Sequence, residues 1–95
     1  MTRFRTLVWR ELADAREKYP TPFRSLHEAY AVLLEEVEEF WIVVREKNQS
    51  EEAALTELTQ IAAMAQRAAE DLQMVPRHRC GEDTCQRLKE SERRE

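Results

Sequence analysis

The sequence predicts an all-α protein, a bundle of about three main helices. Its 95 residues include only one glycine and three prolines, and 42% of them are hydrophobic. Valine, isoleucine and threonine never form the alternating runs of a strand, whereas apolar residues recur at the three- and four-residue steps of a helix. A chain of this length forms one domain, and a core this small often gains stability by oligomerisation.

The first helix is expected from about Thr2 or Arg3 to Lys18. The residues that recur at helical steps, with Trp9 beside them, are Phe4, Leu7, Val8, Glu11, Leu12 and Ala15. The linker Tyr-Pro-Thr-Pro-Phe at 19–23 ends this helix, because proline lacks a backbone donor and restricts the residue before it. We expect this linker to line one end of a site.

A long second helix is expected after Ser25. This serine is the predicted N-cap, and Glu28 three residues later completes a capping box. The 4-3-4-3-4 spacing that is typical of a bundle seam is formed by Leu26, Tyr30, Leu33, Val37, Phe40 and Val44. The helical pattern fades over residues 45–49.

The third helix is expected to start after Ser50 and to end near residues 74–76. Ser50 is its predicted N-cap, and Glu51 and Glu52 suit the positive end of the helix dipole. Its seam is formed by Leu55, Leu58, Ala62, Ala65, Ala69 and Leu72. The apolar surfaces of the second and third helices are wider than one helix pair needs, which suggests a second copy of the chain as partner.

The helical domain is therefore expected over residues 1–76, followed by a charged tail over 77–95. Leu88 is the one large apolar residue after Gly81, so the tail is expected to be partly disordered or to form a short helix. His78, Cys80 and Cys85 offer at most three zinc ligands with an unusual spacing. Two free thiols are the favoured interpretation.

The charge and hydropathy of the chain exclude several classes of protein. The net charge is −4 and the basic residues are interspersed with acids, which is not the pattern of a nucleic-acid binder. No apolar stretch approaches the length of a membrane span, and the N-terminus lacks the apolar region of a signal peptide. We expect a soluble, cytoplasmic protein.

Acidic side chains interrupt the apolar faces of the second and third helices. At about 100° per residue, Glu36 falls among apolar neighbours, namely Ala29, Val32, Phe40 and Val43. Glu57 is enclosed in the same way by Ile61, Met64 and Ala68. Carboxylates are almost never buried without a partner. Two acids aimed from two helices at one interior seam therefore suggest a shared divalent cation.

The other acids of this helix lie further from the seam. Glu39 falls at the edge of the same arc, and Glu28 and Glu35 lie just beyond it. Glu38 is expected to be solvated. For Glu28, Glu35 and Glu38 taken singly, a solvated charged face explains the sequence at least as well as a site does.

A buried ion pair that fixes helix register is a second explanation for Glu36 and Glu57. Arg45 and Arg67 are the nearby basic residues, but both fall toward the polar sides of their helices on the wheel. A cation accounts for the acids better, because hard Mg²⁺ or Mn²⁺ takes oxygen ligands that facing bundle helices can supply.

The two acidic motifs resemble those of a known family. Glu-Glu-x-x-Glu at 35–39 and Glu-x-x-Gln at 57–60 resemble the EExxE and ExxD motifs of the MazG-like all-α nucleoside triphosphate pyrophosphohydrolases. The resemblance covers roughly residues 4–74 and excludes the tail. It implies a homodimer, often assembled further, in which helices of two copies build a four-helix core around Mg²⁺. The implied substrate is a (d)NTP, cleaved between the α and β phosphates to give a monophosphate and pyrophosphate.

The resemblance also implies roles for single residues. Glu36, Glu39, Glu57 and Gln60 stand at the metal-ligand positions, and Glu35 stands where a residue orients or deprotonates the attacking water. No motif marks the substrate-binding residues. The candidates are Arg24, Trp41, Arg45, Lys47 and Arg67. For Trp41, a place in the core or a dimer interface is favoured over stacking on a base.

Gln60 departs from the family pattern, which has aspartate at this position. An amide oxygen can bind a hard cation but brings no charge, so metal affinity should fall. Two hypotheses follow. The first is a Mg²⁺-dependent pyrophosphohydrolase, with Mn²⁺ as a possible substitute. The second is a helical assembly or regulatory protein that keeps the fold and binds nucleotide or metal without turnover.

Overall fold

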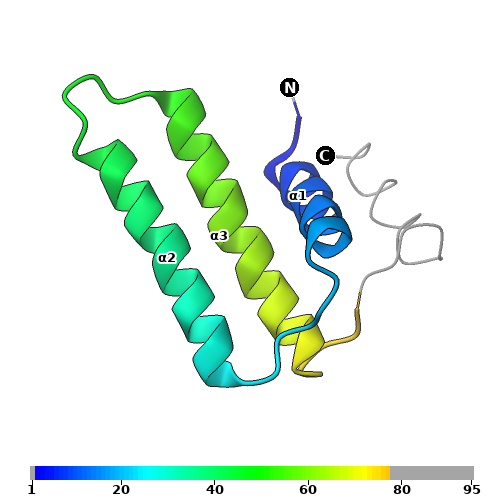
Figure 1. The fold of residues 1–95 in the computed structure, drawn as a ribbon. Helices are drawn as coiled ribbons and strands as arrows, with labels where there is room; N and C mark the ends of the chain where they lie inside the picture. Colours follow the sequence, from blue (N-terminus) through cyan, green and yellow to red (C-terminus); the bar gives the residue numbers. More distant parts are fainter. Residues whose placement is uncertain (1, 78–95) are drawn as a thin grey trace.

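The computed structural model describes residues 2–77 and is helical throughout, with no strand in that range. Its elements are α1 (Phe4–Lys18), α2 (Leu26–Val44) and α3 (Glu51–Asp71). In Figure 1, α2 and α3 run antiparallel side by side, and α3 lies between α2 and α1. The prediction of an all-α bundle of three helices is confirmed. The tail interpretation that involves His78, Cys80 and Cys85 concerns residues outside the described range.

The start of each long helix is fixed by the serine that the sequence indicated. Ser25 Oγ accepts the Glu28 N–H at 3.1 Å, and Ser50 Oγ accepts the Ala53 N–H at 3.1 Å. Each bond satisfies one of the backbone donors that a helix N-terminus leaves free. The return bond of the capping box runs to Arg24, whose N–H donates to Glu28 Oε1 at 2.9 Å.

α3 is the helix on which the other two helices pack. α2 and α1 each contact α3, whereas within residues 2–77 the backbones of α1 and α2 do not approach within 8 Å of each other at their Cα atoms. The buried core comprises Val8 and Leu12 of α1 with Ala63 and Met64 of α3. The half-buried residues around it are Ala15, Phe23, Val32, Leu33 and Ala62. No described helix is both long and apolar enough to cross a bilayer.

The expected seams lie mostly outside this core. On α2, Leu26 and Tyr30 are 63% and 67% exposed, and Val37 is exposed as well. On α3, Leu55 and Leu58 are exposed. Two other seam residues, Leu33 and Ala62, pack against the core, so the helical periodicity identified only part of the packing faces. Ala29, which the predicted seam did not include, is the buried residue of α2.

On the helical wheel, Arg67 falls toward the polar side of its helix. This prediction is wrong, because the arginine is only 3% exposed. Its guanidinium donates to the carbonyl oxygens of Ala15 (3.5 Å), Tyr19 and Thr21 (3.0 Å). It also lies over the ring of Phe23, 5.4 Å from the centroid. A buried charge is costly unless hydrogen bonds satisfy it. Arg67 meets that requirement by binding the end of α1 and the linker that follows.

Acidic residues at the end of α3 complete the cluster around Arg67. Asp71 Oδ2 accepts from Arg67 Nε (3.3 Å) and from the Phe23 N–H (2.9 Å), and its Oδ1 accepts from Arg16 Nη1 (2.7 Å). Arg16 Nη2 also pairs with Glu70 Oε1 at 2.8 Å. Burial disfavours ionisation of Asp71, but these hydrogen bonds and the charge of Arg16 outweigh it and lower its pKa. The cluster therefore joins α1, the linker and α3.

Replacing Arg67 with methionine should destabilise the fold strongly. The substitution fills the space but leaves Asp71 without one of its cations and removes the Arg67 donor from the carbonyl oxygens of Tyr19 and Thr21. Breaking a buried ion pair typically costs about 3–5 kcal/mol. Urea denaturation followed by circular dichroism measures the loss. Arg10→Met, on the exposed side of α1, is the matched control and should change stability by about 0.5 kcal/mol or less. Equal stability of the two variants would contradict the role given to Arg67.

Candidate metal centre

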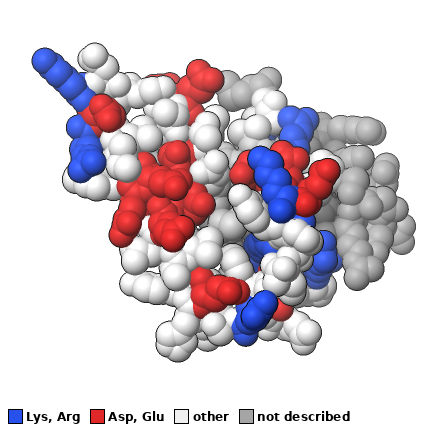
Figure 2. Space-filling view, viewed as in Figure 1, with Lys and Arg blue, Asp and Glu red and all other residues white. Residues whose placement is uncertain are grey.

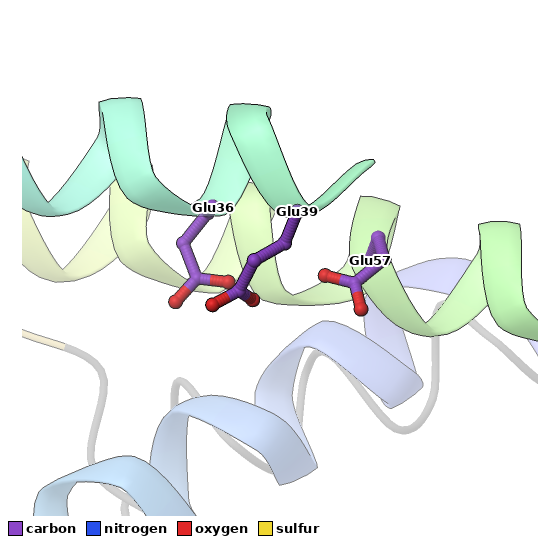
Figure 3. A group of neighbouring side chains, drawn as sticks. All are labelled: Glu36, Glu39 and Glu57. Carbon is purple, nitrogen blue, oxygen red and sulfur yellow. The ribbon is translucent and has the colours of Figure 1, made fainter. Parts of the chain in front are cut away.

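Three carboxylates from two helices converge at the centre of the α2–α3 pair. Glu36 and Glu39 lie one turn apart on α2, and Glu57 lies on the facing turn of α3. One oxygen of each lies within 4.8 Å of the others. Figure 3 shows all three side chains pointing toward one another and toward the side on which α1 lies. The antiparallel pairing of α2 and α3 produces this convergence.

Gln60 connects two of these carboxylates. With its side-chain nitrogen facing the acids, Gln60 donates to Glu36 Oε2 at 3.0 Å and to Glu57 Oε2 at 3.2 Å. This orientation is the one that gives every atom of the amide a suitable partner. The neutral amide holds two negative groups together without adding a third charge between them.

Glu36 and Glu57 of this cluster favour the protonated form, because their carboxyl groups are partly buried and lie close to other acids. Burial raises the pKa of Glu36 to about 7, and the charges of Glu39, Glu57 and Glu11 add to the effect. Burial also raises the pKa of Glu57, with Glu39 as the second cause. Like charges close together and partly removed from water favour the protonated form. A cation among them would remove the same repulsion.

No basic side chain within residues 2–77 forms an ion pair with this cluster. Arg67, one of the two partners that the sequence suggested, is engaged by Asp71 and the linker, and Arg45 is exposed. A register-fixing ion pair is therefore not formed here by the described residues. Three carboxylates are hard donors of the kind that Mg²⁺ and Mn²⁺ prefer. The donor set fits such an ion.

A cavity of about 590 Å³ opens beside the carboxylates, between α1 and α2 and above α3. This volume lies within the usual range of small-molecule sites. Its lining residues are Glu11, Ala15 and Lys18 of α1; Tyr19, Thr21 and Phe23 of the linker; Val32, Glu35, Glu36 and Glu39 of α2; and Gln60, Met64 and Arg67 of α3. Figure 2 shows acidic side chains gathered in a dense patch on this face of the molecule.

The remaining candidates occupy two different places. Glu35 is exposed and lines the cavity next to Glu36 and Glu39. Of the substrate-binding candidates, Arg24, Trp41, Arg45 and Lys47 are exposed and are not part of the cavity lining, whereas Arg67 is buried and lines the cavity. The linker at 19–23 does line the cavity, through three of its five residues.

Two charged lining residues were missed by the sequence reasoning about the site. One is Glu11, which lies close enough to Glu36 to raise the pKa of Glu36. The other is Lys18, the last residue of α1. A signal for Glu11 was present, since it falls within the apolar run of the first helix. Lys18 follows Glu11 by seven residues and so shares its face of the helix. Only the docking of α1 on α3 shows that this face belongs to the site.

Comparison with known proteins finds no match to this chain among protein-family models, curated proteins or solved structures.

The metal-free protein should lose stability as the pH rises from about 5 to 8. The folded pKa of Glu36, about 7, exceeds its ordinary value of 4.5, so the folded state binds more protons than the unfolded state between these values. Stability is full below this window and falls through it. Melting temperatures in EDTA across this range measure the effect, which should amount to a few degrees.

Glu36→Gln is the matched variant, because the amide cannot ionise. Its melting temperature should depend much less on pH and should exceed that of the wild type at pH 8. Asp71 affects stability in the opposite direction, because its pKa is lowered from the ordinary value of 3.8. Its stabilising effect is lost only below about pH 4, which is outside the range from pH 5 to 8. A wild-type melting temperature that rises from pH 5 to 8 would contradict the prediction.

Proposed function

We propose that the protein is a Mg²⁺-dependent nucleoside triphosphate pyrophosphohydrolase of the MazG-like type. It would convert a (d)NTP and water into a (d)NMP and pyrophosphate, in house-cleaning or control of the nucleotide pool. The observation that supports this proposal most is the group of three carboxylates from two helices, Glu36, Glu39 and Glu57, two of which line a cavity of about 590 Å³. The motif order of the sequence supports it independently.

In this proposal Glu36, Glu39 and Glu57 hold the cation. A bound Mg²⁺ neutralises phosphate charge and polarises the phosphorus centre that is attacked. Rotation of the Gln60 amide would present its oxygen to the ion in place of its nitrogen. The two hydrogen bonds from Gln60 keep Glu36 and Glu57 close together before the ion binds. Mn²⁺ has the same preference for oxygen and should substitute.

Glu35 is placed to act on water rather than on the cation. It lines the cavity beside the acidic group and is solvent-exposed. Its proposed role is to accept the proton of the attacking water. The water oxygen forms a bond to the α-phosphorus, and the bond from that phosphorus to the bridging oxygen breaks. The electron pair leaves on pyrophosphate, and the proton passes through Glu35 to solvent.

A homodimer is part of the same proposal. One face of α2 carries a row of exposed apolar residues at helical spacing, comprising Leu26, Tyr30, Leu34, Val37 and Trp41. Leu55 and Leu58 of α3 are exposed as well. A surface of this kind on a small domain marks an interface. Two copies joined through it would pair their α2–α3 hairpins into a four-helix core, and further assembly of such dimers is possible.

Gln60 favours an alternative function. Its amide already satisfies Glu36 and Glu57 without any cation, and it supplies one negative charge fewer than aspartate would. A protein with this site could bind metal or nucleotide weakly and serve as a helical assembly or regulatory protein without turnover. Both functions use the same fold and the same cavity.

Purified protein should release pyrophosphate from at least one (d)NTP when Mg²⁺ or Mn²⁺ is present. Glu36→Gln and Glu57→Gln should each reduce the rate by about 100-fold or more, because each removes a cation ligand. Glu38→Gln changes an exposed acid of the same motif and should leave the rate unchanged. A coupled pyrophosphate assay over a nucleotide panel makes the measurement, with circular dichroism to confirm folding.

Absence of pyrophosphate release from every nucleotide would exclude the hydrolase and favour the alternative. Gln60→Asp then separates the two functions further. It should raise the affinity for Mg²⁺, measured by calorimetry, while lowering the stability of the metal-free protein by adding a like charge. Unchanged affinity would show that Gln60 does not belong to the cation site.

Tyr30→Glu should convert the proposed dimer into a monomer. The substitution places a charge in the exposed apolar row of α2, where burial against a second copy would be costly. Size-exclusion chromatography with light scattering measures the mass. Ala31→Glu changes an exposed neighbour outside the row and should keep the dimer. A monomeric wild type, or an unchanged mass for Tyr30→Glu, would exclude this interface.

A further inference from the structure

The cavity has an acidic end and a basic end, and α1 spans both. Glu11, Ala15 and Lys18 line it from one face of α1. Seven residues separate Glu11 from Lys18, which corresponds to about 10 Å along the helix axis. Glu11 lies at the end near Glu36. Lys18 lies at the other end, next to Tyr19 of the linker.

Lys18 is the basic group of the cavity that is free to bind a ligand. The lining contains two basic residues, Lys18 and Arg67. Arg67 is already engaged, because four of the five N–H donors of its guanidinium bind Asp71 and three carbonyl oxygens. Lys18 has no ion pair or hydrogen bond from its side chain to any other residue in the described range, and it is exposed.

The charge distribution limits how a polyphosphate can lie in this cavity. Four of its lining residues are acidic: Glu11, Glu35, Glu36 and Glu39. They repel an anion everywhere except where a cation is bound among the carboxylates. The ammonium group of Lys18 is the second favourable position, since lysine binds phosphate as a point charge on a flexible stem. A phosphate chain and the side chain of Lys18 are together long enough to span the distance along α1 between the carboxylates and Lys18.

We propose that Lys18 binds the phosphates distal to the cleaved bond, so that the substrate lies along α1 with its pyrophosphate part toward the linker. The assignment rests on the proposed function for the position of the cleaved bond at the carboxylates. Lys18 is then the residue that distinguishes a triphosphate from a monophosphate. It also holds the pyrophosphate that leaves, whose negative charge increases as the bond breaks.

Calorimetric binding of inorganic triphosphate in the presence of Mg²⁺ tests the proposal without requiring turnover. This probe has the phosphate chain but no base or sugar. Lys18→Met in the full chain should weaken its binding by about tenfold or more, the size expected for a charge-assisted contact. Lys18→Arg keeps the charge and should retain most of the affinity. Arg10→Met removes an equal charge from α1 outside this cavity and should have little effect.

A nucleoside monophosphate with Mg²⁺ is the second probe, because it lacks the distal phosphates. Its affinity should be the same for the wild type and Lys18→Met. An equal loss for both probes would place Lys18 at the nucleoside end and overturn the proposal. So would unchanged binding of inorganic triphosphate by Lys18→Met, or a wild type that does not bind this probe at all. Equal melting temperatures for the wild type and Lys18→Met confirm that folding is unaffected.

Pyrophosphate release from nucleotides is measured in parallel, so that the two proposals can fail separately. Lys18-dependent binding without turnover would refute the hydrolase and keep Lys18 as a residue that binds the phosphate chain. Turnover with Lys18-independent binding would keep the hydrolase and refute the assignment of Lys18.

Discussion

The buried guanidinium of Arg67 is the interaction on which the geometry of the site depends. The backbones of α1 and α2 do not approach each other closely, so α3 and the linker at 19–23 set the width of the space between them. Arg67 holds both the end of α1 and that linker through carbonyl oxygens, and Asp71 binds the linker through the Phe23 N–H. Placing a charge there costs several kcal/mol unless its donors are satisfied. The same bonds that meet this cost build one wall of the cavity.

The molecule contains two clusters of charge with opposite properties. Around Arg67 each carboxylate has a cationic partner, and the pKa of Asp71 is lowered. Around Glu36 the carboxylates have only one another and a neutral amide, and the pKa of Glu36 is raised to about 7. The first cluster stabilises the fold without further help. The second reduces the stability of the metal-free fold as it ionises, and such arrangements occur where a ligand compensates the charge.

The sequence was sufficient for the features that are local along the chain. The three helices and the caps at Ser25 and Ser50 follow from residues within a few positions, and the wheel brought Glu36 and Glu57 toward one seam. It could not determine which apolar face of α2 meets α3, because both faces have the same periodicity. The role of Arg67 was also hidden. Its acceptors Ala15, Tyr19 and Thr21 lie 46–52 residues away, and no helical periodicity carries that information. Glu11 and Lys18 join the cavity for the same long-range reason.

The position of α1 has a consequence for how the site is assembled. α2 and α3 are neighbours in sequence, whereas α1 packs on α3 from far along the chain and supplies Val8 and Leu12 to the buried core. The α2–α3 pair carries Glu36, Glu39 and Glu57, and α1 with the linker encloses the cavity beside them. Because the core and the bonds of Arg67 hold α1 on α3, the part of the fold that encloses a ligand and the part that carries the acids belong to one cooperative unit. Access to the acids is therefore linked to the stability of the whole fold.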